Sequence, residues 1–168
     1  GKEWAKHFDT ISVCFSKGLG APIGSCLVGT KEFVTRAKRI RKLFGGGMRQ
    51  AGAAAAGALY AFDHHIDRLA DDHRNAQVIA EALRDVPGLR LDPPDVQTNL
   101  VWFEIDPEFG TAKDIQAALG KHGVLVSSTA PQWCRACTHL DVSATQAERA
   151  ADVIRRALRT RAPVATSS

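Results

Sequence analysis

Residues 9–25 read DTISVCFSKGLGAPIGS and place Lys17 between an apolar run and a stretch rich in small residues. The run over residues 10–15 predicts a short buried strand, and a second strand is expected over 24–29. A lysine that a buried strand carries into a glycine turn is desolvated, which lowers the pKa of its ammonium group. The neutral amine can then attack a carbonyl and form a Schiff base. The glycines leave room for a flat cofactor or a phosphate beside the main chain.

A solvated hairpin lysine is the alternative interpretation of the same spacing. The segment is not a Walker A loop, because Lys17 precedes the glycines and no Gly-Lys-Ser/Thr follows a strand. The choice between a reactive and a solvated lysine therefore depends on the rest of the chain.

Helical periodicity predicts the next elements. Thr30 is expected to cap a helix that the glycine run at 45–47 ends. One apolar stripe then continues without a break, so a single long helix is expected from about residue 48 to 85. Its first turns are nearly all Ala and Gly, which lets another helix or subunit approach closely. Beyond it we expect short strands alternating with helices, typical of a compact α/β or α+β unit: strands at 89–91, 98–105, 124–126 and 137–142, and helices at 112–122 and 144–159. Ser143 is expected to cap the last of these helices.

Three ordered segments of the chain resemble the L-threonine aldolases. Residues 9–25 look like the lysine segment of that family, residues 45–50 (GGGMRQ) match a second segment, and residues 138–143 (THLDVS) resemble a third. The family belongs to the aspartate aminotransferase-like, or fold type I, enzymes that use pyridoxal 5'-phosphate (PLP), and it is grouped with the aromatic amino-acid β-eliminating lyases. The resemblance implies an α/β chain that forms the C-terminal part of a fold type I PLP-dependent transferase.

The same resemblance implies a division of the chain. Residues 1–47 would end the large PLP-binding domain, residues 48–87 would form a long linking or interface helix, residues 88–161 the small domain, and residues 162–168 a tail. The chain has no initiator methionine, so we expect that it was processed or that it starts inside a longer protein. The family's acid for the pyridine nitrogen and its ring-stacking histidine come from earlier segments, so we expect these residues alone to have little or no aldolase activity.

The resemblance also implies roles for particular side chains. Lys17 would form the Schiff base with PLP, and the adjacent Ser16 would contact the cofactor. Arg49, in a glycine-flanked turn at a helix start, suits an oxyanion such as phosphate, and Lys42 matches a basic position of the same family region. Without the resemblance, a surface arginine is the favoured interpretation of Arg49. Arg135 would grip the substrate carboxylate in a two-pronged pair, although the sequence around it departs from the family pattern.

The implied activity is that of a lyase. It would cleave L-threonine and L-allo-threonine-like β-hydroxy-α-amino acids into glycine and an aldehyde, in a homo-oligomer, dimer or tetramer, with shared active sites. Two alternatives stay open: another PLP-dependent β-eliminating lyase, and a catalytically inert fragment or assembly module.

Composition excludes several other classes. The chain has 168 residues, 45% hydrophobic and 24% charged, as in a soluble globular protein, and no apolar run of 18 residues to span a membrane. Within the segment 31–49, no aromatic residue is interleaved with the basic residues Arg36, Lys38, Arg39, Arg41 and Lys42. We therefore expect a solvated or inter-subunit face and no nucleic-acid partner. The four cysteines lack the pattern of a secreted disulfide framework, so reduced thiols in the cytoplasm are expected.

A metal site is not expected either. Cys134, Cys137 and His139 lie close together, but a single Cys-x-x-Cys lacks the second ligand pair of a zinc ribbon. If this segment is a strand, Arg135, Cys137 and His139 share one face and Cys134 points the other way.

Overall fold

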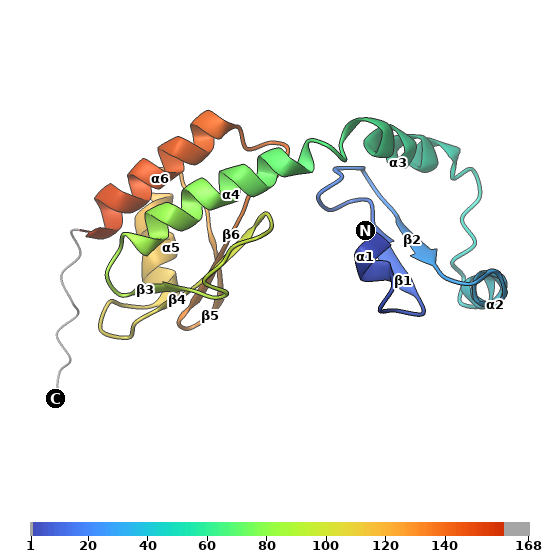
Figure 1. Ribbon diagram of the computed structural model, residues 1–168, viewed down its shortest axis with the longest axis horizontal. Coiled ribbons are helices and arrows are strands. Elements are labelled where there is room, and N and C mark those ends of the chain that lie inside the picture. The colour runs from blue at the N-terminus through green and yellow to red at the C-terminus, as the bar shows by residue number, and fades with distance from the viewer. Residues whose placement is uncertain (1, 160–168) are drawn as a thin grey trace. The chain divides into compact units, whose positions relative to one another are not determined.

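The computed structural model describes residues 2–159, and the chain divides into two compact units, Gly1–Arg68 and Leu69–Ser168. The N-terminal unit contains helices α1 (Lys2–Ala5), α2 (Lys31–Leu43) and α3 (Gly52–His64) and strands β1 (Ile11–Cys14) and β2 (Ser25–Val28). The C-terminal unit contains, in chain order (Figure 1), α4 (Leu69–Arg84), β3 (Leu89–Leu91), β4 (Leu100–Ile105), α5 (Ala112–Gly120), β5 (Ser127–Ala130), β6 (Trp133–Cys137) and α6 (Ala144–Arg159).

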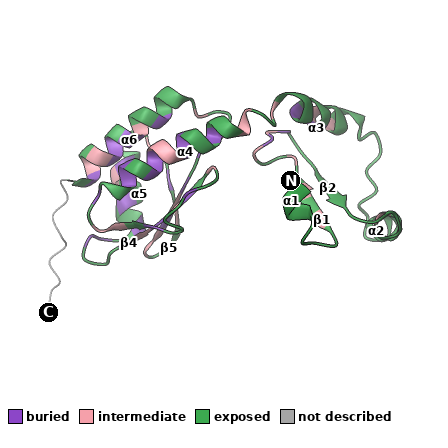
Figure 2. Cartoon of the chain, in the orientation of Figure 1, coloured by how far each residue is buried: buried purple, intermediate pink, exposed green. Residues whose placement is uncertain are grey.

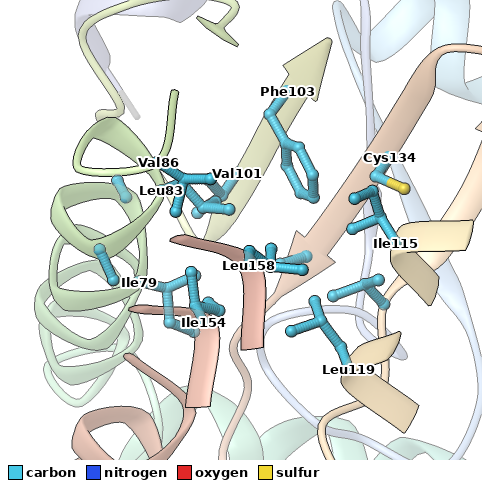
Figure 3. Packing of buried hydrophobic residues seen from close by; sticks show 14 of the residues in the cluster. Ile79, Leu83, Val86, Val101, Phe103, Ile115, Leu119, Cys134, Ile154 and Leu158 are labelled. Atoms are coloured by element: carbon cyan, nitrogen blue, oxygen red, sulfur yellow. The ribbon is translucent and has the colours of Figure 1, made fainter. Parts of the chain in front are cut away.

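The C-terminal unit is an antiparallel sheet with three helices on one face. The strand order is β3-β4-β6-β5, and α4 and α6 run side by side (Figure 1). All three helices send apolar side chains into one core, where they meet Val101, Phe103 and Cys134 of the sheet (Figure 3). Phe103 is fully buried at its centre. Burial of this apolar surface is the main force that stabilises the unit.

Strand alternation separates the two faces of this sheet. Along β4, Val101, Phe103 and Ile105 are buried, whereas the residues between them are more exposed. Along β6, Cys134 and Ala136 are buried in the same way. Because successive side chains of a strand point to opposite faces, Trp102 and Arg135 lie on the face away from the core.

The N-terminal unit buries little apolar surface (Figure 2). We expected two buried strands, but every residue of β2 is exposed and β1 alternates between intermediate and exposed. The apolar stripe of α2 is exposed as well, with Phe44 at 83%. The expectation of burial was wrong because β1 and β2 form a two-stranded ribbon, and among residues 2–159 no further strand pairs with either edge. Little of their surface is therefore covered.

The prediction of one long helix over residues 48–85 is wrong. The structure has two helices, α3 and α4, with turns at residues 65–68 between them. The boundary between the two units falls in this break, and α4 contributes Ile79 and Leu83 to the core of the C-terminal unit. The apolar stripe keeps its phase across the break, and no glycine or proline marks it. Periodicity therefore gave no sign of it.

Two strands also differ from expectation. The strands predicted at 124–126 and 137–142 are instead β5 at 127–130 and β6 at 133–137. Val124, Leu125 and Val126 do not lie in a strand, and Leu125 is 87% exposed. The sheet is completed by the polar sequence Ser127–Ala130, which pairs with β6 along a single edge. Such an edge strand needs no apolar pattern to form its hydrogen bonds.

The predicted helix caps are confirmed. The Thr30 hydroxyl accepts a hydrogen bond from the Phe33 amide at 3.2 Å, and the Ser143 hydroxyl accepts one from the Gln146 amide at 3.3 Å. The tail expected over 162–168 lies outside the described residues. Within residues 2–159, no helix combines the length and the hydropathy that a bilayer crossing requires.

Candidate functional site: the lysine turn and the arginine of β6

Lys17 lies in a hydrogen-bonded loop between β1 and β2. The Gly20 amide donates to the Lys17 carbonyl at 2.8 Å, and the Ala21 amide donates to the Phe15 carbonyl at 2.9 Å. The Phe15 amide closes the loop by donating to the Gly24 carbonyl at 2.9 Å. Gly20 and Gly24 have φ values of 69° and 111°, which non-glycine residues rarely adopt. The sequence therefore fixes the backbone around the lysine.

Helix α3 supports this loop. Phe15 makes an edge-to-face contact with Phe62, with ring centroids 5.4 Å apart. The His65 ring bonds through Nδ1 to the Leu19 carbonyl at 2.6 Å. Leu19 and Ala21 are both buried. The polar backbone of the turn thus has a partner at the end of α3, and the lysine is carried on a supported loop.

Gly57 marks the closest approach between α3 and the lysine turn. A Cβ atom at Gly57 would lie 2.9 Å from Cδ of Pro22, whereas a Cβ at Gly52 would meet nothing within 4 Å. Gly57→Ala is therefore expected to loosen the turn, although alanine favours a helix interior by about 1 kcal/mol over glycine. Hydrogen exchange at the Gly20 and Ala21 amides should become about fivefold faster or more.

Gly52→Ala provides the matched control, because it makes the same change on the same helix in open space. It should leave exchange at the two turn amides within about twofold of the original protein. Equal exchange in the two variants would show that the contact with Pro22 does not support the turn.

The side chains of Ser16 and Lys17 are exposed. The expectation of a desolvated lysine therefore does not hold within the described residues. The reason is the open hairpin: the turn buries Leu19 and Ala21 against its own unit and directs Lys17 to the outside. An amine presented in this way is accessible to a carbonyl group of a ligand.

Lys42 and Arg49 flank the glycine run that follows α2. Lys42 is in the last turn of α2, and Arg49 lies three residues before α3 starts at Gly52. Both side chains are exposed. Gln50 has a φ of 51°, so the chain turns sharply just before the helix. Ala51 caps α3 without a side-chain hydrogen bond, so its first amides are not satisfied by a capping side chain.

Arg135 lies in the middle of β6. Its direct neighbours across the sheet are Trp102 on β4 and Ser127 on β5. Its guanidinium carbon is 5.5 Å from the centroid of the Trp102 ring. Its Nε is buried and has no hydrogen-bond partner among residues 2–159. The guanidinium lies on the sheet face away from the core, and its planar, charged fork is suited to binding an anion such as a carboxylate.

The segment 138–143 is anchored to α4. The buried Thr138 hydroxyl donates to the Asp72 carbonyl at 2.6 Å, and the Asn75 amide donates to the Val142 carbonyl at 2.9 Å. His139 lies 3.6 Å from the Asp141 carboxylate. These contacts hold the end of β6 in place, so this segment has a structural role beside Arg135.

Cys134 and Cys137 lie on opposite faces of β6. Cys134 is fully buried, and Cys137 shares the open face with Arg135. Burial raises the pKa of the Cys137 thiol, while the positive charge of Arg135 opposes that rise. Within residues 2–159, no three His, Cys, Asp or Glu side chains converge in an arrangement suited to a metal ion.

Burial also raises the pKa of the Cys134 thiol, from 9.0 to about 11. The folded protein therefore keeps this proton at pH values where the unfolded chain releases it, so the contribution of Cys134 to stability falls as the pH rises from 9 to 11. We expect the difference in unfolding free energy between the original protein and Cys134→Ala to shrink between pH 8 and pH 11. Urea unfolding at both pH values measures it. A difference that stays the same would contradict the buried, protonated thiol.

The structure places the predicted residues in both units. Ser16, Lys17, Lys42 and Arg49 belong to the N-terminal unit, and Arg135 belongs to the C-terminal unit. Sequence reasoning missed Trp102, because its position beside Arg135 depends on strand register. It also gave no role to His65, which binds the Leu19 carbonyl at the end of α3.

Comparison with known proteins shows where this chain belongs. Residues 1–106 match the family model described as beta-eliminating lyase. The chain is 42% identical over 142 residues to a protein of Arabidopsis thaliana assigned as low-specificity L-threonine aldolase 2. This match covers 83% of this chain and 40% of that protein. It is 40% identical over 149 residues to the low specificity L-threonine aldolase of Escherichia coli K12, covering 86% of this chain and 41% of that protein. The chain thus spans about two fifths of the length of these relatives.

Solved structures agree on the fold. A Listeria monocytogenes protein assigned to the L-allo-threonine aldolases superposes with a TM-score of 0.78 at 22% identity, over 96% of this chain and 46% of that one. The ornithine aminotransferase of Toxoplasma gondii superposes with a TM-score of 0.68 at 20% identity, over 92% of this chain and 37% of that one. The predicted α/β fold, that of part of a fold type I chain, is therefore confirmed. The chain belongs to the beta-eliminating lyase family.

Proposed function

We propose that this chain is part of a PLP-dependent lyase that cleaves L-threonine, L-allo-threonine and similar β-hydroxy-α-amino acids into glycine and an aldehyde. The observation that carries the proposal is the identity of about 40% to low-specificity L-threonine aldolases over most of the chain. Because the chain spans only about two fifths of those proteins, the activity is proposed for the whole enzyme and not for these 168 residues alone.

The residues present are compatible with PLP and an amino-acid substrate. Lys17 offers an accessible amine on a supported loop, and Arg135 offers a cation with an unpartnered, buried Nε. In this proposal Lys17 would hold the cofactor through its aldehyde group, and Ser16, Lys42 and Arg49 would hold its phosphate and nearby atoms. Arg135 binds and orients the substrate carboxylate through a forked pair of hydrogen bonds. When bound, PLP supplies the electron sink that lets a bond to the α-carbon break.

We further propose a division of labour along the chain. Residues 1–47 close the cofactor domain, residues 48–87 connect it to the next domain, and residues 88–161 form the small domain that carries Arg135. The structural boundary after residue 68, and the side chains that α4 adds to the core of the C-terminal unit, support grouping α4 with the small domain.

The assembly is proposed to be a homo-oligomer, either a dimer or a tetramer. Leu59 and Tyr60 of α3 are 62% and 59% exposed, and contiguous exposed apolar side chains favour burial against another surface. All four cysteines are free, three of them exposed, which supports a reducing compartment such as the cytoplasm.

The test is to incubate the PLP-loaded holoenzyme with L-threonine and to measure glycine and acetaldehyde. Equal amounts of the two products support the aldolase. The second candidate, β-elimination, is favoured by the description of the matching family, and it would yield ammonia and a keto acid instead of glycine. If the protein binds no PLP and forms neither set of products, the proposal is without support and an inert assembly module is favoured.

A further inference from the structure

We propose that Trp102 is a positioning residue, which holds the Arg135 guanidinium in the orientation that receives a substrate carboxylate. This inference deepens the proposed function and depends on the carboxylate-binding role proposed for Arg135. Its own basis is the register and geometry of the sheet in the C-terminal unit.

The register makes Trp102 and Arg135 direct partners. In the antiparallel pairing of β4 with β6, Trp102 lies opposite Arg135, one step before Phe103 opposite Cys134. Phe103 and Cys134 are buried in the core, so Trp102 and Arg135 share the other face of the sheet. Directly opposed side chains on one face are close enough to interact along their whole length. The pairing of β4 with β6 therefore makes Trp102 an immediate neighbour of Arg135.

The contact geometry is that of a cation on an aromatic ring. The guanidinium carbon lies 5.5 Å from the centroid of the Trp102 ring, within the range of an attractive cation–π interaction. Among aromatic side chains tryptophan gives the strongest attraction, and the planar guanidinium also stacks. On the other side of Arg135 the direct neighbour is Ser127, whose short side chain offers no comparable surface.

The buried Nε shows which donors are left for a ligand. Nε is inaccessible and has no hydrogen-bond partner in the described part of the chain, although Arg135 as a whole is only partly buried. A carboxylate therefore approaches the two terminal nitrogens of the guanidinium, which form a fork of matching geometry. Trp102 fixes the plane of this fork before the substrate arrives, and ordering a binding group in advance strengthens binding.

The first arm of the test needs no catalysis. Because the Nε–H of Arg135 is buried in the structure, its proton should exchange slowly and give a distinct signal in a ¹⁵N NMR spectrum, assigned by its loss in Arg135→Lys. Trp102→Leu should broaden this signal or speed its exchange at least about tenfold, whereas Trp102→Phe, which keeps a ring, should change it about twofold. Trp133→Leu removes an indole from the same strand and face as Arg135 and is the matched control, with no change expected. An unaltered Arg135 signal in Trp102→Leu would overturn the proposal.

The second arm uses the PLP-loaded holoenzyme and L-threonine. Trp102→Leu should raise KM about tenfold while kcat stays within about twofold, and Trp102→Phe should raise KM about twofold. In an Arg135→Lys background, Trp102→Leu should add less than about a twofold rise in KM, because the tryptophan acts through the guanidinium. The same tenfold rise in that background, or an equal rise in Trp133→Leu, would overturn the positioning role.

The two arms separate this inference from the proposed function. If the holoenzyme releases no glycine, the proposed function fails, and the NMR arm still decides the positioning role by titration with acetate as the carboxylate probe. Acetate should then shift the Arg135 signal in the original protein and shift it at about tenfold higher concentration in Trp102→Leu. Equal acetate affinity in the two proteins would overturn the inference.

Discussion

Lys17→Ala is expected to abolish glycine release from L-threonine in the PLP-loaded holoenzyme, with a loss of at least about 10³-fold in kcat. The alanine variant should retain the loop, because the hydrogen bonds of the loop join backbone groups, among them those of Gly20, Ala21 and Gly24. It lacks the amine that links to the cofactor. The variant should also lose the visible absorption of lysine-bound PLP, which spectrophotometry detects independently of activity.

Two variants sharpen this experiment. Lys17→Arg keeps the positive charge but cannot form the covalent link at neutral pH, so it should be as inactive as Lys17→Ala. Lys38→Ala removes an exposed lysine from α2 in the same unit and should leave kcat within about twofold. Borohydride reduction should fix the cofactor to the peptide that contains Lys17. Fixation to another lysine would show that the reactive amine lies elsewhere.

Arg135→Gln is expected to lower kcat/KM for L-threonine by about 100-fold. A hydrogen bond to a charged group contributes about 1.5–3 kcal/mol, so losing a charged fork corresponds to roughly two orders of magnitude. Arg135→Lys should recover part of the loss, because lysine restores the charge without the fork. Steady-state kinetics measures kcat/KM for the holoenzyme forms of the original protein, Arg135→Gln and Arg135→Lys.

The substrate itself supplies a control for Arg135. L-threonine amide lacks the carboxylate, so the original enzyme should prefer L-threonine strongly, while Arg135→Gln should lose most of that preference. Arg149→Gln, a change at an exposed arginine of α6, should retain it. If Arg135→Gln discriminates as well as the original enzyme, a different group binds the carboxylate.

Much of the fold follows from local patterns. The lysine hairpin, α2 with its Thr30 cap, and α6 with its Ser143 cap were predicted from residues close in sequence, where turn chemistry and capping operate. The break between α3 and α4 was not, since no local residue announces it. The position of β5 was not predicted either, because a polar edge strand is specified by its neighbour β6 and not by its own pattern.

The candidate site, like the fold, could be predicted only in part from the sequence. Lys17 and Arg135 could be proposed from the sequence because their segments resemble those of a known family. The exposure of Lys17 contradicted the expected desolvation, since burial depends on what covers the hairpin and not on the apolar run itself. The position of Trp102 beside Arg135 could not be predicted from the sequence, because it depends on the register of β4 against β6.

The self-contained core of the C-terminal unit has an evolutionary consequence. Val101, Phe103 and Cys134 secure the sheet from one side, so natural selection can vary the opposite side with little risk to folding. If the proposed function holds, substitutions at positions such as 102 and 127 adjust which amino acids the enzyme accepts, while the core beneath them stays unchanged. One ancestral framework can diversify into enzymes with different preferences by this route.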